Sequence, residues 1–407
     1  MLLHVLLVCA FAVATAEFVL VGLLPDIAAG LAVSLPTGGL LVTAYMLVAT
    51  IGGPVAAVLT RRAKRRRVLA CTMALALASA VVSARADSYG LLLGARLGSA
   101  PAEALFVAVA SQVAMAVVPA ARQTAAVARI FNGFALATLI GLPLGTLVGQ
   151  RYGWHAAFVL VAVLSAAGLV GVLVFCPDVP QPTDGRLGHG LAMLLRPPVV
   201  FGLAVTGLAL TGFVAAFTYV APMLRDLAGL EDVGVSVALV VYGLGTIAGT
   251  VLASRVHPRR ILDILPAPLA ALAAVLLAQG ALMHQAVTAV LSLLLMGASA
   301  FVVVPLVQTW LMGEVGPSAA GVAAAVNVSV AGLAAALGAG LGGAVIATGL
   351  GLAWVSPIAG LLPLAAMGTA LALRRVARFP RPSEAPGNLP CCHPSPPTRS
   401  EEAFSCC

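Results

Sequence analysis

The amino-acid sequence predicts an all-α membrane protein with twelve transmembrane helices in two six-helix halves. Composition and pattern both predict this class. Only 9% of the 407 residues are charged and 61% are hydrophobic, whereas about 25% of residues are charged in ordinary soluble domains. Twelve apolar segments are each long enough to cross a bilayer, which takes about 20 residues. A polar, proline-bearing stretch near the middle leaves six segments on each side.

The composition also excludes several classes of function. A chain with so few charges is neither disordered nor a nucleic-acid binder, and it lacks the charged surface of a soluble enzyme. Its formal net charge of +8 is explained by loop arginines at one face of a membrane, without a nucleic-acid partner. The lipid bilayer is therefore the expected surrounding, and no cofactor is expected.

The predicted spans differ in how clearly they are bounded, and the last three have short, apolar separators. Many are rich in alanine and glycine, which allow close helix packing in lipid. The first has no cationic region before it, so it is interpreted as an uncleaved span and not as a signal peptide. The spans are residues 2–24, 38–60, 68–86, 90–118, 124–149, 154–176, 199–223, 234–254, 262–280, 286–312, 318–347 and 353–373.

The spans divide the chain into two halves, a linker and a tail. We predict an N-terminal half at 1–176, a cytoplasmic linker at 177–198, a C-terminal half at 199–374 and a cytoplasmic tail at 375–407. A basic loop follows the second span of each half, which suggests duplicated halves as in transporters with parallel repeats. The tail is rich in proline and serine and is expected to be disordered. Its cysteine pairs, Cys391-Cys392 and Cys406-Cys407, match no established zinc spacing, so no metal site is expected.

The distribution of arginine predicts the orientation. With both termini in the cytoplasm, most of the 22 lysines and arginines fall in cytoplasmic loops, as the positive-inside rule requires. The arginine-dominated composition, with Lys64 as its single lysine, is typical of a GC-rich genome. The expected location is the bacterial cytoplasmic membrane. The main basic loop, interpreted as a topology anchor in preference to a gating element, contains Arg61, Arg62, Arg65, Arg66 and Arg67.

Ionisable residues inside the spans are the strongest functional candidates, because each costs at least a few kcal/mol in lipid. Glu17 lies deep in the first span and is a candidate proton carrier. Asp26 lies nine residues later on the opposite side of the helix, so the two acids cannot share a proton without a helix break. Arg96 and Glu103 share one face of the fourth span, but their axial separation of about 10 Å is expected to prevent pairing within the helix. For each of these residues, a purely structural partnership is the alternative.

Uncharged polar residues in other spans are candidates for lining a substrate cavity. Amides and tyrosines are buried only with hydrogen-bond partners, and a mixed apolar and polar pocket suits a small amphipathic ligand. A purely structural role is the alternative for each. The candidates are Tyr45, Asn132, Tyr219, Gln308 and Asn327.

Five short motifs, in order along residues 8–375, resemble the twelve-span drug:proton antiporter family of the major facilitator superfamily. Within that family, the chain is most similar to bacterial exporters of the arabinose-efflux and chloramphenicol-resistance type. Where the family carries an acid in the loop after the second span, this chain has Arg61. The motifs are Thr15-Ala16-Glu17-Phe18 with Gly22-Leu23-Leu24-Pro25-Asp26, Gly141-Leu142-Pro143-Leu144-Gly145 with Gly149-Gln150, Phe217-Thr218-Tyr219-Val220-Ala221-Pro222, Pro305-Leu306-Val307-Gln308-Thr309, and Asn327 with Gly338, Gly342 and Gly343.

The resemblance implies the major facilitator fold and a monomeric, proton-coupled exporter of a small molecule, such as chloramphenicol, that works by alternating access. It implies a proton-coupling role for Arg96 and an antiporter motif at Gly141, Pro143, Gly145 and Gly149, where the glycines stripe one helix face and the proline kinks the helix. Ordinary helix packing is the alternative for that motif. No phosphate-binding loop or HExxH spacing occurs, so an enzyme is not expected. The remaining alternatives are efflux of a sugar, nucleoside or other metabolite, import by proton symport, and a transport-inactive sensor.

Overall fold

The computed structural model describes residues 1–60, 62–119, 123–177, 196–315 and 320–378. Its N-terminal half consists of α1 (Leu2–Gly22), α2 (Leu24–Gly30), α3 (Leu35–Leu59), α4 (Arg65–Ser83), α5 (Tyr89–Ala116), α6 (Gln123–Leu136), a π-helical turn (Ala137–Gly141), α7 (Leu142–Tyr152) and α8 (Trp154–Phe175). Its C-terminal half consists of α10 (Pro197–Thr218), α11 (Val220–Asp226), α12 (Asp232–Ser254), α13 (Ile261–Ile264), α14 (Pro266–Leu282), α15 (Ala286–Val315), α16 (Ala320–Ala347) and α17 (Val355–Arg378).

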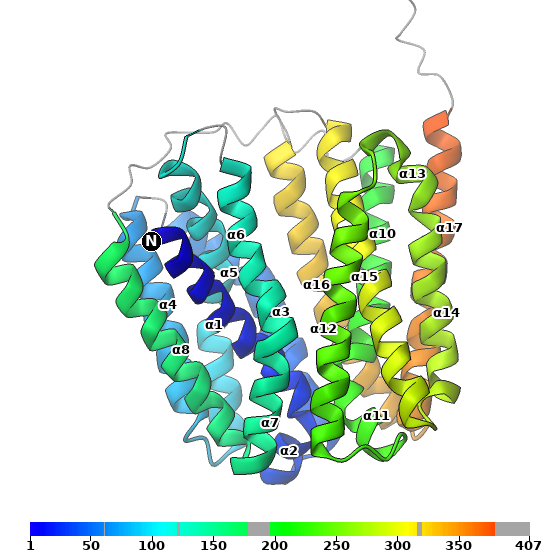
Figure 1. The fold of residues 1–407 in the computed structure, drawn as a ribbon, viewed down its shortest axis with the longest axis horizontal. Helices are drawn as coiled ribbons and strands as arrows, with labels where there is room; N and C mark the ends of the chain where they lie inside the picture. The colour runs from blue at the N-terminus through cyan, green and yellow to red at the C-terminus, as the bar shows by residue number, and fades with distance from the viewer. Residues whose placement is uncertain (61, 120–122, 178–195, 316–319, 379–407) are drawn as a thin grey trace, which may run out of the picture.

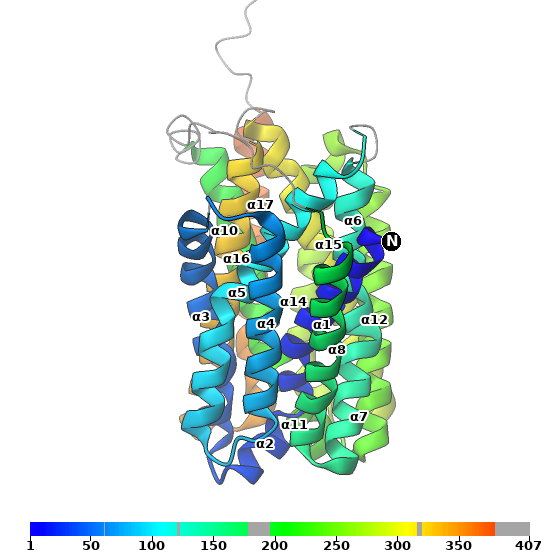
Figure 2. The ribbon, with the colours of Figure 1, turned by 90° about the vertical axis from the view of Figure 1, so that its left-hand side faces the viewer.

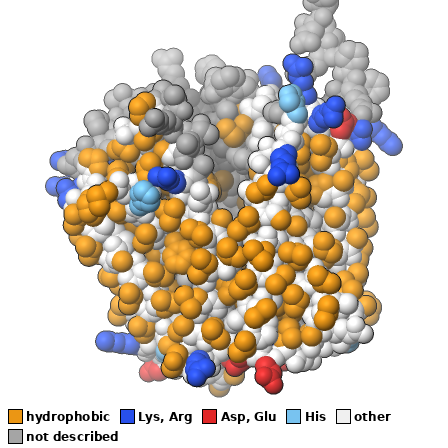
Figure 3. All heavy atoms as spheres, viewed as in Figure 1, with side chains coloured by type: hydrophobic (Ala, Val, Ile, Leu, Met, Phe, Trp, Pro, Cys, Tyr) orange, Lys and Arg blue, Asp and Glu red, His pale blue; other side chains and the backbone are white. Residues whose placement is uncertain are grey.

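The described residues contain 12 helical segments long and apolar enough to cross a membrane, as predicted. Figure 1 shows them side by side in two halves, and Figure 2 shows the bundle from the side of the N-terminal half. A wide band of hydrophobic side chains separates two ends where charged side chains gather (Figure 3). We call the end with the N-terminus and the arginines of α4 the basic end, and the other the opposite end.

The first span of each half is broken near the opposite end. The break lies at Leu23 between α1 and α2, and at Tyr219 between α10 and α11. Pro25 and Pro222 follow directly, and because proline has no backbone N–H, the preceding helix cannot continue its hydrogen bonds through them. The apolar pattern of each region predicts a single span, and the structure adds a short second helix to each.

The span that contains the predicted antiporter motif is irregular just before its proline. Pro143 lies at the second position of α7, and the π-helical turn Ala137–Gly141 precedes it. The proline cannot donate to the carbonyl of Leu139, and a wider turn is one way a helix accommodates such a lost bond. The structure thus shows a π-helical turn next to Pro143, and a kink at this proline stays a prediction.

The hydrophobic clusters differ between the two ends. Near the basic end, one cluster around Leu69 and Phe106 draws only on the N-terminal half, and another around Leu269 and Leu306 draws only on the C-terminal half. Toward the opposite end, the cluster around Phe217 contains Val21 and Leu142 from the N-terminal half. The two halves thus share a core toward the opposite end and have separate cores toward the basic end.

Two regions form the most extensive contacts between the halves, and α11 adds smaller contacts with α1 and α2. α3 packs against α16, and α12 packs against α7 and the π-helical turn. Gly243 of α12 lies against the backbone of Thr138 and Leu139, and no side chain would fit between these helices. The predicted linker and most of the predicted tail lie outside the described residues, so these boundaries stay predictions.

Candidate functional site

A buried polar cluster lies in the middle of the N-terminal half. Arg96 and Glu103 of α5 are each 3% exposed, and Tyr45 of α3 is 5% exposed. The Tyr45 hydroxyl donates a hydrogen bond to Oε2 of Glu103. The Arg96 guanidinium lies 4.3 Å from the centre of the Tyr45 ring. Close packing of α3 on α5, where Gly52 contacts Pro101, brings the three side chains together.

The expectation that Arg96 and Glu103 cannot pair within their helix was wrong. Arg96 Nη1 lies 3.9 Å from Glu103 Oε1. The axial separation of their backbones is two helical turns, but both side chains are long and lean toward each other along a shared face. The prediction of that shared face is confirmed, and the distance estimate failed because it ignored side-chain reach.

Glu17 completes this cluster from α1. Its side chain is half-buried, and it interacts electrostatically with both Glu103 and Arg96. The group therefore contains two carboxyls and one guanidinium, whose Nε atom is buried without a hydrogen-bond partner. One cation can neutralise one carboxylate, so a second ionised carboxylate is left uncompensated in a low-dielectric environment.

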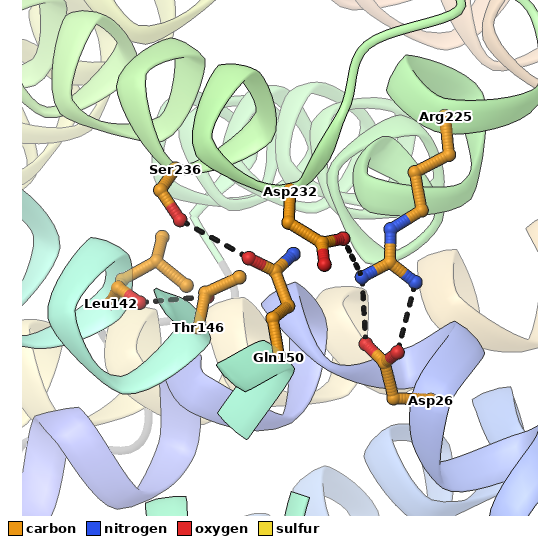
Figure 4. A network of polar contacts seen from close by, with 7 residues as sticks. All are labelled: Asp26, Leu142, Thr146, Gln150, Arg225, Asp232 and Ser236. Atoms are coloured by element: carbon orange, nitrogen blue, oxygen red, sulfur yellow. Dashed lines mark hydrogen bonds and ion pairs between the residues drawn. The ribbon is translucent and has the colours of Figure 1, made fainter. Parts of the chain in front are cut away.

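Asp26 lies elsewhere, at the opposite end. The break at Leu23 turns α2 away from α1, and Asp26 forms a bidentate pair with Arg225 of α11, with both N–O distances 3.0 Å. Arg225 also contacts Asp232 at 3.0 Å, and Figure 4 shows this network together with Gln150 and Ser236. The structure therefore separates Asp26 from the other three charged candidates, Glu17, Arg96 and Glu103.

The C-terminal half contains a neutral hydrogen-bonded group. Thr206 of α10 donates to the Asn327 side chain at 2.7 Å, and Asn327 donates to Gln308. Two cavity candidates, Gln308 and Asn327, are thus neighbours, with Asn327 buried and Gln308 half-buried. Asn132 has an exposed side chain on α6.

Tyr219 has a packing position between the halves. It lies at the break between α10 and α11, is fully buried, and donates to the carbonyl of Ala339 at 3.3 Å. Its ring and hydroxyl lie against Gly39 of α3 and Gly342 of α16. This contact favours the structural alternative for Tyr219.

The glycines of the predicted antiporter motif lie along α1, as their spacing predicts. Gly141 contacts Thr15, Gly145 contacts Val19 and Gly149 contacts Leu23, and a methyl group at any of the three glycines would overlap its neighbour. The motif therefore holds the π-helical turn and α7 close to the helix that carries Glu17.

The basic loop is only partly described, because Arg61 lies outside the described residues. Arg62 and Arg67 are exposed, whereas Arg65 is buried. Arg66 donates to the carbonyl of Leu173 near the end of α8, where a cation also interacts favourably with the helix dipole. This contact anchors α4 to α8.

An aromatic cluster was not predicted from the sequence. Phe217 stacks on Tyr242 at 4.7 Å and on Phe213 at 5.5 Å between ring centroids. Phe301 and Phe18 approach the same group edge-on. Because aromatic residues make up only 5% of the chain, composition gave no signal for it, and only the Phe217–Tyr219 motif indicated its neighbourhood.

The described residues form twelve apolar helices in two halves, one of which holds a cluster of ionisable groups, and this is the architecture of a multi-pass membrane transporter. The Major Facilitator Superfamily matches residues 6–339, and the chain belongs to this family. It is 34% identical over 319 residues to the inner membrane transport protein YdhP of Escherichia coli (strain K12), covering 78% of this chain and 82% of that protein. Such relatives are transporters and not enzymes.

Two further likenesses bear on cargo and fold. The chain is 38% identical over 267 residues to a chloramphenicol resistance protein of Streptomyces lividans, covering 65% of this chain and 68% of that protein. A crystal structure of a bacterial homolog of the human lysosomal transporter Spinster, in an inward-facing and unoccupied conformation, superposes with a TM-score of 0.76 at 16% identity. This match covers 92% of this chain and 96% of that one, and it shows the fold.

Proposed function

We propose that this protein is a proton-coupled secondary transporter that exports a small molecule across the cytoplasmic membrane by alternating access. The observation that carries this proposal is the cluster of Glu17, Arg96 and Glu103 inside the spans, with Tyr45 bound to Glu103. Ionisable groups at this depth are costly and typical of proton relays. We place the basic end and both termini in the cytoplasm, because the arginines gather there.

The cluster can couple protons to movement by exchanging the partner of Arg96. With Glu17 protonated, Arg96 pairs with Glu103, as observed at 3.9 Å. When Glu17 loses its proton, a second carboxylate competes for the same guanidinium, so the balance of contacts between α1 and α5 changes. Since the glycine stripe holds α7 against α1, a shift of α1 reaches α7 and the interface with α12.

We propose a drug such as chloramphenicol, or a related small amphipathic compound, as the cargo. The Streptomyces lividans relative supports this choice. The half-buried Gln308 offers a neutral hydrogen-bonding surface, and the aromatic cluster around Phe217 offers an apolar one. Efflux of a sugar, nucleoside or other metabolite by the same fold is the second candidate, supported by the absence of charge on the Thr206–Asn327–Gln308 group. We propose a monomer as the functional unit.

The test is drug resistance in a host that lacks its own exporters. Cells that produce the protein should survive higher chloramphenicol concentrations, and Glu17→Gln should abolish this protection while reaching the membrane in normal amounts. Glu231→Gln, at an exposed acid of the opposite end, is the matched control and should protect fully. Protection by Glu17→Gln equal to that of the parent would remove Glu17 from the mechanism. The same cells are also tested against a panel of other drugs. If the parent protein protects against none of them and not against chloramphenicol, the cargo is a metabolite.

A further inference from the structure

At the opposite end, Arg225 forms one ion pair with Asp26 of the other half and a second with Asp232 of its own half. Asp26 belongs to α2 of the N-terminal half, whereas Arg225 and Asp232 belong to α11 and the start of α12 in the C-terminal half. Arg225 holds both acids at the same distance, 3.0 Å. The pair with Asp26 therefore joins the two halves, and the pair with Asp232 lies within one of them (Figure 4).

Gln150 adds a second connection between the halves. It ends the glycine stripe of α7, and with its amide oxygen facing Arg225 it accepts from Nη2 at 2.9 Å and donates to the carbonyl of Asp232 at 3.0 Å. The hydroxyl of Ser236 lies 3.4 Å from the same amide group. Both short helices that follow the breaks, α2 and α11, are thereby tied to α7 and α12.

We propose that this network is the gate of the opposite end, and that Arg225 exchanges its partners when the gate opens. When the halves part at this end, the contacts of Arg225 with Asp26 and Gln150 break, because they cross the interface. The contact with Asp232 persists, because both residues move with the C-terminal half. Asp26 therefore closes the gate, and Asp232 keeps Arg225 paired while it is open.

The surroundings of the network fit a gate that opens reversibly. The side chains of Arg225 and Asp26 are 20% and 26% exposed, so their bidentate pair is partly shielded from water, where charged hydrogen bonds are strongest. Asp232 is 56% exposed and stays available in water. Behind the network lies Val21, which is 5% exposed and belongs to the hydrophobic cluster shared by both halves. This inference rests on the alternating access of the proposed function, and is independent of cargo and proton.

The experiment measures access to a cysteine behind the gate. All seven native cysteines are replaced by serine, Val21→Cys is introduced, and a membrane-impermeant maleimide is added from the side of the opposite end in intact cells. Asp26→Asn should raise the labelling rate about tenfold, which corresponds to about 1.4 kcal/mol less stabilisation of the closed gate. Gln150→Ala should raise it less, and Asp232→Asn should lower it, because the open state then leaves Arg225 without its partner.

Glu231→Gln is the matched control, since it removes an acid at the same end next to Asp232, and its labelling rate should equal that of the parent. The gate would be overturned if the labelling rates of Asp26→Asn and Arg225→Gln equal that of the parent. The exchange of partners would be overturned if Asp232→Asn is labelled faster than the parent. If Asp26→Asn does not reach the membrane, Gln150→Ala and Arg225→Gln decide. Labelling needs neither cargo nor proton gradient, so the two proposals can fail separately. Unchanged labelling together with normal drug efflux would overturn only the gate. Changed labelling together with an absence of drug efflux would overturn only the proposed function.

Discussion

The two halves of the molecule have corresponding architecture and different contents at corresponding positions. The first spans break at Leu23 in one half and at Tyr219 in the other. The separation of these two residues in the chain equals that of Gly53 and Gly249. Gly53 packs against Ala104, and Gly249 packs against Ala298. The same interval leads from Glu17 to Phe213. The residues just before the two alanines are Glu103 and Gly297, so both carboxyls of the N-terminal cluster have uncharged counterparts.

The C-terminal half fills the corresponding space with aromatic rings. Phe213 stacks on Phe217, and Phe217 stacks on Tyr242, whose backbone carbonyl lies against Gly297. The C-terminal half thus builds a corresponding broken helix and a corresponding glycine contact with aromatic rings where the N-terminal half has carboxyl groups. The architecture of a half does not require Glu17 or Glu103. Since charges inside a membrane are costly, this comparison favours a functional origin for them.

The largest expected effect follows from removing the cation of the N-terminal cluster. Arg96→Met leaves Glu103 buried without its counter-ion, and breaking a buried pair in this way costs about 3–5 kcal/mol. The free energy of unfolding, measured by titration with sodium dodecyl sulfate in mixed micelles, should fall by that amount. The double variant Arg96→Met/Glu103→Met should recover most of the loss, because it makes the N-terminal half resemble the C-terminal one. Equal stability of Arg96→Met and the parent would show that Arg96 does not compensate a buried charge.

A smaller effect on the free energy of unfolding is expected from replacing the tyrosine in the second span of each half, Tyr45 in α3 and Tyr242 in α12. Tyr45→Phe removes the hydrogen bond to Glu103, and such bonds to charged groups contribute about 1.5–3 kcal/mol. Tyr242 stabilises its half through its ring, which Tyr242→Phe retains, so the free energy of unfolding should change less than in Tyr45→Phe. The same titration compares the two variants. Equal losses would mean that the Tyr45 hydroxyl contributes no more than ring packing.

The interface glycine of α12 gives a third effect. A methyl group in Gly243→Ala would overlap the backbone of Thr138 and Leu139 in the other half, so it should weaken the shared core and open the opposite end. Labelling of Val21→Cys from that side should rise several-fold, by about 1 kcal/mol in free-energy terms. Gly313→Ala, at a glycine with no atom near its added methyl group, is the control. An unchanged labelling rate in Gly243→Ala would show that the two helices can move apart at Gly243 without opening the gate.

The sequence predicted the spans and the charged candidates because both depend on the cost of exposing or burying single side chains in lipid. Twelve apolar segments and a shared face for Arg96 and Glu103 follow from length and helix periodicity alone. The neighbourhood of Gln308 and Asn327 did not follow, because it depends on how α15 and α16 approach each other. The prediction that Arg96 and Glu103 lie too far apart to pair was wrong for a related reason, because the length of two side chains bridges the spacing of their backbones.

The network at the opposite end was missed because its partners come from distant parts of the chain. Arg225 lies in a short helix after an unpredicted break, and nothing in its local pattern connects it with Asp26. The motif Gly149-Gln150 was noted, but periodicity gives no partner for an amide at the end of a helix. The prolines at 25 and 222 were the available signal, because each marks a place where its span cannot continue unbroken.

The smallest effect is expected at the basic end, where the C-terminal half has an ion pair. Asp263 of α13 lies 2.7 Å from Arg374 of α17, and the two side chains are 48% and 32% exposed. Exposed pairs contribute about 0.2–1 kcal/mol, so Asp263→Asn should lower the free energy of unfolding by no more than this, and high salt should reduce the difference. Arg67 occupies the corresponding place in the N-terminal half, at the interval that separates Gly53 from Gly249. Because the N-terminal half has a cation where the C-terminal half has an acid, the pair is not required by the duplicated fold. A loss above about 1 kcal/mol, or one that salt does not reduce, would show instead that the C-terminal half depends on this contact.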